Sequence, residues 1–180
     1  MTAGTGADDV ALARLTDDQR AADAAEARRR EQWLHRQAAE GGTLAGVLRD
    51  LAERGLLVAV ATSAGRTIRG SVVTVGCDFV GLRALHGERV LIAMAAITAL
   101  RPEPASTATS GDRAVPDGAS LGAVLAELAT DGSRVSVRTD DGAAMAGRLR
   151  AVGTDVLTMQ GDVSSLTYIP LARVNDVVLG

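Results

Sequence analysis

Apolar positions along the chain change their spacing in the same order twice. Over residues 44–51, and again over 121–128, apolar side chains recur at intervals of three and four, which is typical of one buried helix face. The spacing then falls to two, as at Val58 and Val60, and such alternation predicts strands. Glycines and short polar runs divide the rest of each region into about five short strands. The pattern therefore predicts a mainly β protein in which a helix followed by five strands occurs twice.

The two regions align without a gap when the sequence is shifted by 77 positions. Thr43 and Ser120 then match as N-caps of the predicted helices, because a hydroxyl oxygen accepts a hydrogen bond from the first helical turn. An ungapped register over about 60 residues indicates a duplicated domain. The aligned identities include Leu44/Leu121, Val47/Val124, Leu48/Leu125, Leu51/Leu128, Gly55/Gly132, Val58/Val135, Val60/Val137, Gly65/Gly142, Gly70/Gly147, Gly76/Gly153, Asp78/Asp155 and Ile92/Ile169.

Polar segments separate the two copies and precede the first one. The stretch from Arg101 to Gly118 is rich in Pro, Ser, Thr and Gly, which is typical of a flexible linker. Thr16 and Gln19 fit a capping box, and the residues that follow are mostly strong helix formers. We therefore expect a flexible tail (1–15), an N-terminal helix (16–40), a first small bent barrel (43–101), a flexible linker (102–117) and a second barrel (118–180).

One phrase occurs in both copies, as VTVGCDFVGL from Val73 and as RAVGTDVLTM from Arg150. Each version has a Val-Gly pair, one further residue, an Asp and an apolar alternation. We expect Gly76 and Gly153 to form the corners between successive barrel strands, because glycine accepts backbone angles that other residues avoid. The aspartate that follows each corner is then part of a structural bend rather than of a chemical site.

The order of one helix and five bent strands, with the stretches VAVATSAGRTIRGSVVTVGCDFVGL and VLIAMAAITAL, resembles the Sm-like (LSm) fold. The glycine and apolar positions of that family's first motif correspond to Gly65, Ile68, Gly70, Val72, Val80 and Leu82, and in the second copy to Gly142, Met145, Gly147, Leu149 and Leu157. Residues 92–100 and the stretch YIPLARVNDVVL resemble the second motif. The resemblance covers both copies and implies tandem five-stranded barrels, a pattern that other SH3-like barrels largely share.

The residues with which Sm-like proteins bind RNA are not matched. RNA-binding members of the family hold the base with an Asp after the second glycine and an Asn beyond it, whereas glycine occupies that Asp position in both copies. The Arg-Gly pair in the turn of the second motif is absent as well, since the chain has AMAA and PLAR there. The resemblance therefore implies the fold, and binding of RNA or single-stranded nucleic acid is an alternative function.

Composition limits the possible partners and chemistry. The net charge of −3 and the pI near 5.4 oppose a strong general affinity for nucleic acid or an anionic membrane. No apolar run has the roughly 18 residues of a transmembrane helix and the N-terminus lacks a signal-peptide pattern, so we expect a cytoplasmic protein with no membrane contact. The single cysteine, Cys77, excludes an internal disulfide and is expected to be a small packing residue.

No catalytic, metal or cofactor site is predicted. The two histidines, His35 and His86, fall in different segments, whereas a metal site needs three or four convergent ligands. The sequence contains neither a phosphate-binding loop nor a nucleophile elbow. We therefore expect a protein that is not an enzyme and that needs no cofactor.

Four arginines on or near the turns of the first copy are candidate contacts for an anion or a nucleic acid. They are Arg66, Arg69, Arg83 and Arg89. Trp33 and Leu34 are candidates for docking the N-terminal helix on a barrel or on another subunit. Residues 43–104 contain seven arginines against five acidic residues, and residues 118–180 contain five against seven. The opposed charges would suit head-to-tail contact between unlike copies, as an orienting effect.

These observations favour a non-enzymatic assembly or adaptor module. Exposed strand edges pair with neighbouring strands, so the two copies are expected to pack as a pseudo-dimer or to form homo-oligomers. The same edges would accept a protein partner. Nucleic-acid binding is the less favoured alternative, because aromatic residues that could stack on bases make up only 2% of the chain.

Overall fold

The fold is described from a computed structural model, whose described residues are 19–20, 23–34, 36, 42–103, 118–161 and 165–180. Contacts group the chain into two units, Met1–Gly41 and Gly42–Gly180. In the first unit, residues 23–34 are helical, and the predicted ends of that helix at 16 and 40 lie outside the described residues. Trp33 is 56% exposed and Leu34 is 54% exposed, so the docking role of these two side chains stays a prediction.

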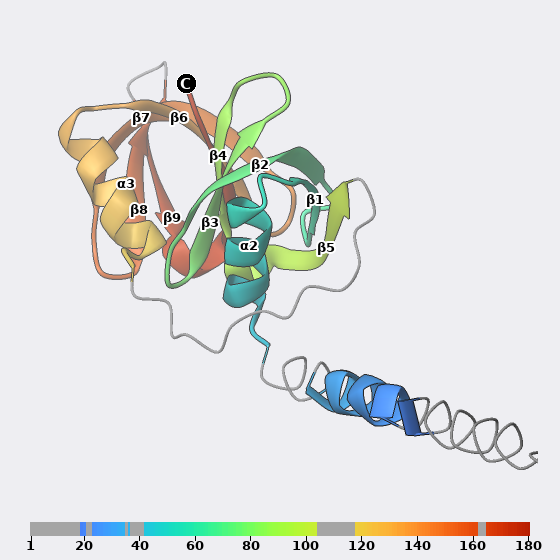
Figure 1. Ribbon diagram of the computed structural model, residues 1–180. Coiled ribbons are helices and arrows are strands. Elements are labelled where there is room, and N and C mark those ends of the chain that lie inside the picture. The colour runs from blue at the N-terminus through green and yellow to red at the C-terminus, as the bar shows by residue number, and fades with distance from the viewer. Residues whose placement is uncertain (1–18, 21–22, 35, 37–41, 104–117, 162–164) are drawn as a thin grey trace, which may run out of the picture. The chain divides into compact units, whose positions relative to one another are not determined.

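The second unit consists of two repeats with the same order of elements (Figure 1). The first repeat contains α2 (Leu44–Glu53), β1 (Leu57–Thr62), β2 (Thr67–Val75), β3 (Phe79–Ala84), β4 (Arg89–Ala93), the short 3-10 helix η1 (Met94–Ala96) and β5 (Ile97–Glu103). The second repeat contains α3 (Leu121–Thr130), β6 (Arg134–Thr139), β7 (Ala144–Val152), β8 (Val156–Gln160), β9 (Leu166–Pro170), η2 (Leu171–Arg173) and β10 (Val174–Leu179). Most bounds differ by 77 positions, which is the spacing of the predicted duplication. The strand β5 extends two residues into the segment that was predicted as linker.

Local signals explain how each helix begins and ends. The Thr43 hydroxyl accepts a 3.0 Å hydrogen bond from the Gly46 amide, and the Ser120 hydroxyl accepts one of 3.1 Å from the Ala123 amide. Gly55, which follows α2, has a φ of 63°, a left-handed conformation that only glycine adopts without strain. The predicted N-caps are therefore confirmed, and each contributes about 1 kcal/mol to helix stability.

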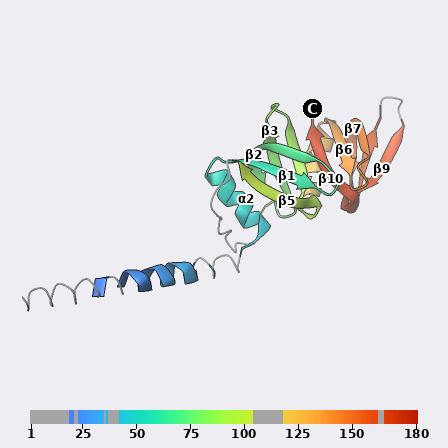
Figure 2. The ribbon, with the colours of Figure 1, turned by 90° about the vertical axis from the view of Figure 1, so that its right-hand side faces the viewer.

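The strands form one ten-stranded antiparallel sheet, in the order β5-β1-β2-β3-β4-β10-β6-β7-β8-β9 (Figures 1 and 2). The expectation of a mainly β protein is confirmed, whereas the sheet does not close and tandem barrels are not confirmed. One sheet runs through both repeats because β4 of the first repeat pairs with β10 of the second instead of ending at an open edge. The sheet therefore begins at β5 and ends at β9.

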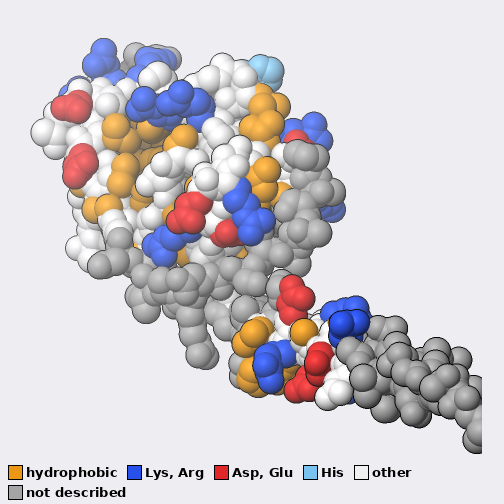
Figure 3. Space-filling view, viewed as in Figure 1, with side chains coloured by type: hydrophobic (Ala, Val, Ile, Leu, Met, Phe, Trp, Pro, Cys, Tyr) orange, Lys and Arg blue, Asp and Glu red, His pale blue; other side chains and the backbone are white. Residues whose placement is uncertain are grey.

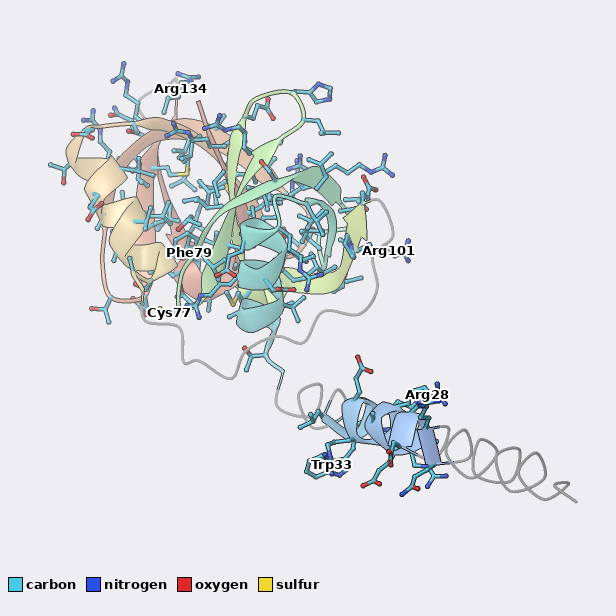
Figure 4. All side chains as sticks on the ribbon, in the orientation of Figure 1. Arg28, Trp33, Cys77, Phe79, Arg101 and Arg134 are labelled. Carbon is cyan, nitrogen blue, oxygen red and sulfur yellow. The ribbon has the colours of Figure 1, made fainter. Side chains whose placement is uncertain are left out.

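Each repeat buries a core beneath its own helix. Leu48 and Leu51 of α2 pack with apolar residues of β1 to β4, and Leu121 and Leu125 of α3 pack with those of β6 to β10. The second core also includes two residues of the first repeat, which are Phe79 and Leu91. Figure 4 shows Phe79 in the interior, on the side of β3 that faces the second repeat. The two cores are thus joined where the repeats meet.

Cys77 differs from its prediction. It is exposed rather than packed in a core, and its amide donates a 3.3 Å hydrogen bond to the carbonyl of Ala119. The residue lies in the short corner between β2 and β3, where alternate side chains no longer face the core. The backbone bond to Ala119, and not apolar packing, connects Cys77 (labelled in Figure 4) to the segment that enters α3.

Candidate functional site: the junction between the repeats

The junction is built on the pairing of β4 with β10. The paired Cα positions are Ile92 with Asp176, Leu91 with Val177, Val90 with Val178 and Arg89 with Leu179. The Gly180 amide donates to the Arg134 carbonyl in β6, so alternation along β10 turns the backbone groups of Val177 and Leu179 toward β4. The register therefore places two hydrogen-bonded residue pairs between the repeats.

A buried carboxylate joins the first repeat to the second. Asp176 on β10 has a side chain with no exposed surface, and its Oδ1 accepts a 2.8 Å hydrogen bond from Nη1 of Arg66, in the turn before β2. Arg138 Nε lies 3.8 Å from Oδ2, which accepts no hydrogen bond from the described residues. Burial raises the pKa of Asp176 above its ordinary value, and the two arginines oppose that rise. The pair fixes one turn of the first repeat against β10.

An amide beside this carboxylate makes a second polar link. The side chain of Asn175, which is fully buried, donates a 2.8 Å hydrogen bond from Nδ2 to the hydroxyl of Ser63. Ser63 is itself held by a 2.9 Å bond from its amide to the carbonyl of Ala96. The turn Ser63 to Arg66 thus contacts the start of β10 at two successive residues.

The third link involves the repeated aspartate. Asp78, in the corner after β2, accepts a 2.7 Å hydrogen bond at Oδ1 from the Leu121 amide, the first in α3. The amides at a helix N-terminus lack partners within the helix and carry partial positive charge, so a carboxylate stabilises them. The corner also leaves no space at Gly76, where an added Cβ would lie 2.6 Å from the Ala119 carbonyl oxygen. Asp78 therefore acts across the repeat boundary.

The two outer strands hold the same repeat positions as the junction strands. The 77-residue shift matches β9 with β4 and β5 with β10. Leu91 is 6% exposed in the junction, whereas its counterpart Tyr168 is 65% exposed on the open edge of β9. Leu121 is buried at the start of α3, whereas its counterpart Leu44 is 37% exposed at the start of α2. The residues that the other repeat covers at the junction therefore have exposed counterparts on β9 and at the start of α2.

Each open edge strand contains a proline that the junction strands lack. The Leu171 amide donates to the Asp155 carbonyl, so alternation turns the backbone of Leu166, Tyr168 and Pro170 away from β8. On β5 the same alternation turns Leu100 and Pro102 away from β1. Proline removes a donor at an edge without loss inside the sheet. The outward donors of Leu166, Tyr168 and Leu100 remain able to pair.

The structure divides the four candidate arginines into two pairs. Arg66 is bound to Asp176, and Arg69 lies 3.3 Å from Glu103. Arg83 and Arg89 are exposed and stand directly opposite each other on β3 and β4, a like-charged pairing that costs stability.

Further arginines of the second repeat lie along the same rim of the sheet. Arg134 and Arg148 stand opposite each other on β6 and β7. Arg134 also lines a groove with Arg89 and His86. Figure 3 shows arginine side chains gathered along the upper rim, and Figure 4 places Arg134 there. This basic rim spans both repeats, whereas the sequence had indicated arginines of the first repeat alone.

The described residues were also compared for metal-binding groups, shifted pKa values and membrane-spanning helices. No group of three or more His, Cys, Asp or Glu side chains in the described part of the chain is arranged to hold a metal ion. Hydrogen bonds from the Thr139 hydroxyl and the Ala143 amide lower the pKa of Asp141, in an ordinary turn between β6 and β7. Among the described helices, none combines the length and apolar character needed to span a membrane.

Apart from Arg66, the polar residues of the junction were not predicted as contacts from the sequence. Asp176 and Asn175 interrupt the otherwise apolar run VNDVVL, and two adjacent polar residues in a buried strand are a signal for a specific contact. Asp78 was interpreted as part of a bend, although its recurrence in both repeats was visible. At Gly76 the structure shows a close approach of backbone and ring rather than a positive φ.

Comparison with known proteins adds no identity. No protein-family model matches the chain, and no curated protein matches its sequence.

Proposed function

We propose that this protein is a non-enzymatic assembly module of the Sm-like type, which joins copies of itself head to tail through the open strands β9 and β5. One observation carries the proposal: these strands occupy the repeat positions of β4 and β10, which already pair within the chain. A surface of one repeat therefore has a demonstrated partner in the other repeat. Each edge of the sheet carries one unpaired strand of this kind, β5 at one edge and β9 at the other. An unpaired edge is a template for pairing.

The shift of 77 positions defines the pairing expected between two chains. Tyr168 of one copy opposes Leu100 of the next, and Leu166 opposes Pro102. Since Pro102 lacks an N–H, the two pairs form one backbone bond fewer than their counterparts in the junction. Pairing would also cover Tyr168 and Leu166, which are both more than half exposed. The pairing of β9 with β5 between chains is therefore weaker than the pairing of β4 with β10 within the chain, which suits reversible assembly.

The substitution Tyr168→Pro tests this pairing. The Tyr168 amide points away from β8, so proline removes an outward donor and leaves the β8 pairing intact. Light scattering over a range of concentrations should give masses above 18.4 kDa for the wild type and a monomer for the variant. Tyr168→Ala is the matched control, because it removes the ring but keeps the donor, and it should weaken assembly less. A wild-type chain that stays monomeric at high concentration contradicts the proposal.

The basic rim favours a second candidate function, the binding of a single-stranded nucleic acid. Like-charged arginines face each other at Arg83/Arg89 and at Arg134/Arg148, and a phosphate backbone would relieve that repulsion. Arg83→Gln with Arg89→Gln should then weaken binding of a labelled oligonucleotide and flatten its salt dependence. Arg101→Gln is the control, since Figure 4 shows Arg101 on β5, away from the rim. No binding at low salt would exclude this function.

A further inference from the structure

We propose that Asp155 binds the N-terminus of α2 in a second copy of the chain, through the amide of Leu44. The inference rests on the proposed head-to-tail assembly and identifies the residue that docks the helix at that contact. It assigns a role to the second occurrence of the repeated aspartate. Asp78 already performs this role within the chain, where its carboxylate accepts the Leu121 amide at 2.7 Å.

The corner that carries Asp155 has the same backbone geometry as the corner that carries Asp78. The Gly76 amide donates to the Phe79 carbonyl at 2.9 Å, and the Gly153 amide donates to the Val156 carbonyl at 2.7 Å. The Asp78 carbonyl accepts the Met94 amide at 2.8 Å, and the Asp155 carbonyl accepts the Leu171 amide at 2.7 Å. Since the backbone at both corners is held alike, the two carboxylates leave the sheet in equivalent positions.

The receiving helix is matched as well. Leu44 is the first residue of α2, as Leu121 is of α3, and both helices have a hydroxyl N-cap that bonds the third amide. That bond leaves the first amide for another acceptor. No hydrogen bond from elsewhere in the described residues reaches the Leu44 amide, and none reaches the Asp155 carboxylate.

Space at the corner supports the approach of a second chain. At Gly76 the close neighbours are the Phe79 ring and the Ala119 carbonyl, which lies in the segment that enters α3. Gly42 occupies the position of Ala119 before α2, and a smaller residue fits the same approach. At Gly153 a Cβ would meet only Val156 within 4 Å, so this corner is open. The contact would continue the β9–β5 pairing, as the Asp78 contact continues the β4–β10 pairing.

A double-mutant cycle between the two sides tests the contact. Asp155→Ala removes the acceptor, and Leu44→Pro removes the donor at the first helical position, where proline is well tolerated. Each change should weaken self-association about tenfold in sedimentation equilibrium, the loss expected for one capping interaction. Leu44→Ala controls for the lost leucine side chain. Glu127→Ala, on the exposed side of α3, controls for the lost charge. Circular dichroism melting confirms that each variant is folded.

The outcomes separate this inference from the proposed function. It is supported if Leu44→Pro weakens association more than Leu44→Ala, and if that difference disappears in the Asp155→Ala background. It is overturned if Asp155→Ala associates as the wild type or as Glu127→Ala does, while Tyr168→Pro still abolishes assembly. If Tyr168→Pro has no effect on association, the edge pairing fails and the inference fails with it.

Discussion

The junction strands β4 and β10 and the open strands β5 and β9 occupy matching positions in the duplicated fold, yet their side chains differ. The junction holds the buried ion pair of Asp176 with Arg66. The corresponding residues on the open surfaces are Ala99 and Ala143, which cannot form it. The junction strands lack proline, whereas each open strand has one directed outward. The matching strand edges are therefore held by a buried ion pair at the junction, whereas the open strands β5 and β9 lack that pair.

The difference shows which part of an interface each kind of residue determines. The edge strands and the corner aspartate occur at matching positions in both repeats, so they define geometry. The buried polar residues Asp176 and Asn175 occur in one repeat only, so they define which edges stay joined. A buried ion pair adds less net stability than its distance suggests, because both charges lose water, but it disfavours misaligned registers. We therefore infer that the ion pair of Asp176 with Arg66 keeps β4 and β10 in one register, and we call this its locking role.

The largest difference is expected for the apolar pair Leu91 and Tyr168. Leu91→Ala should lower the free energy of unfolding by about 3 kcal/mol, because it leaves a cavity where the two cores meet. Tyr168→Ala should change it by less than about 0.5 kcal/mol in dilute protein, since the ring is mostly exposed there. Urea denaturation of both variants measures the contrast. Equal losses would show that the two edges are equivalent in the isolated chain.

Removal of the locking carboxylate should have the next largest effect. Asp176→Ala should destabilise the fold by about 2 kcal/mol, less than for a fully buried pair, because Arg66 remains 36% exposed and can recover water. Ala99→Asp, the change in the opposite direction at the matching position, should be close to neutral in dilute protein. Chemical denaturation at neutral pH compares the two. A stable Asp176→Ala variant would refute the locking role.

The raised pKa of Asp176 gives the same residue a pH signature. Its carboxyl binds a proton more tightly in the folded chain than in the unfolded chain, where its pKa is near 3.8. Protonation therefore stabilises the folded state, and this contribution is lost as the pH rises from 3.8 through the raised pKa. The stability of the wild type relative to Asp176→Asn should decline over that interval. A difference that is constant with pH would contradict the assignment.

The two corner glycines provide a smaller contrast. Gly76→Ala should cost about 1.5 kcal/mol, because its Cβ would overlap the Phe79 ring and the Ala119 carbonyl. Gly153→Ala should be neutral or slightly stabilising, since its Cβ fits and alanine restricts the unfolded chain. Thermal melts of the two variants decide the point. Equal destabilisation would mean that both corners need glycine for its backbone angles alone.

Transfer of the lock to the open surfaces should have the smallest effect. The double variant Ala99→Asp with Ala143→Arg reproduces, between chains, the positions of Asp176 and Arg66. A groove beside β5, lined by Ala61 and Ala99, provides the space. Self-association should tighten about tenfold relative to Ala99→Asp alone, as for one well-formed charge pair. If the double variant associates no better than that single variant, the chains do not meet in this register.

Local structure could be predicted from the sequence because its signals are local. Thr43 and Ser120 were identified from spacing and residue type, and the strands from alternation. The pairing of β4 with β10 could not be predicted, since open edges carry similar apolar patterns and only contacts distant in sequence choose between them. The prediction that Cys77 packs in a core was wrong, because polarity patterns do not show which corner residues face solvent.

The candidate site was predicted less well than the fold. Arg66 was selected as a contact for an anion, and the structure gives it an anionic partner within the chain, Asp176. The role of Asp78 depends on where α3 begins in space, which no spacing along the chain reveals. The duplication was nevertheless the useful guide, because it allows a contact seen once in the chain to be translated to the open surface.

Disulfide trapping in a Cys77→Ser background is the most direct test of that translated contact. Arg101→Cys and Thr167→Cys correspond to Val178 and Val90, which oppose each other across the junction. They should therefore form a non-hydrogen-bonded pair between chains, with Cα atoms about 4.5 Å apart, within disulfide range. Oxidation should give a ladder of covalent oligomers in steps of 18.4 kDa, absent from each single variant and reduced when Glu103→Cys replaces Arg101→Cys. Monomer alone, or equal ladders from both pairs, would contradict head-to-tail assembly through β9 and β5.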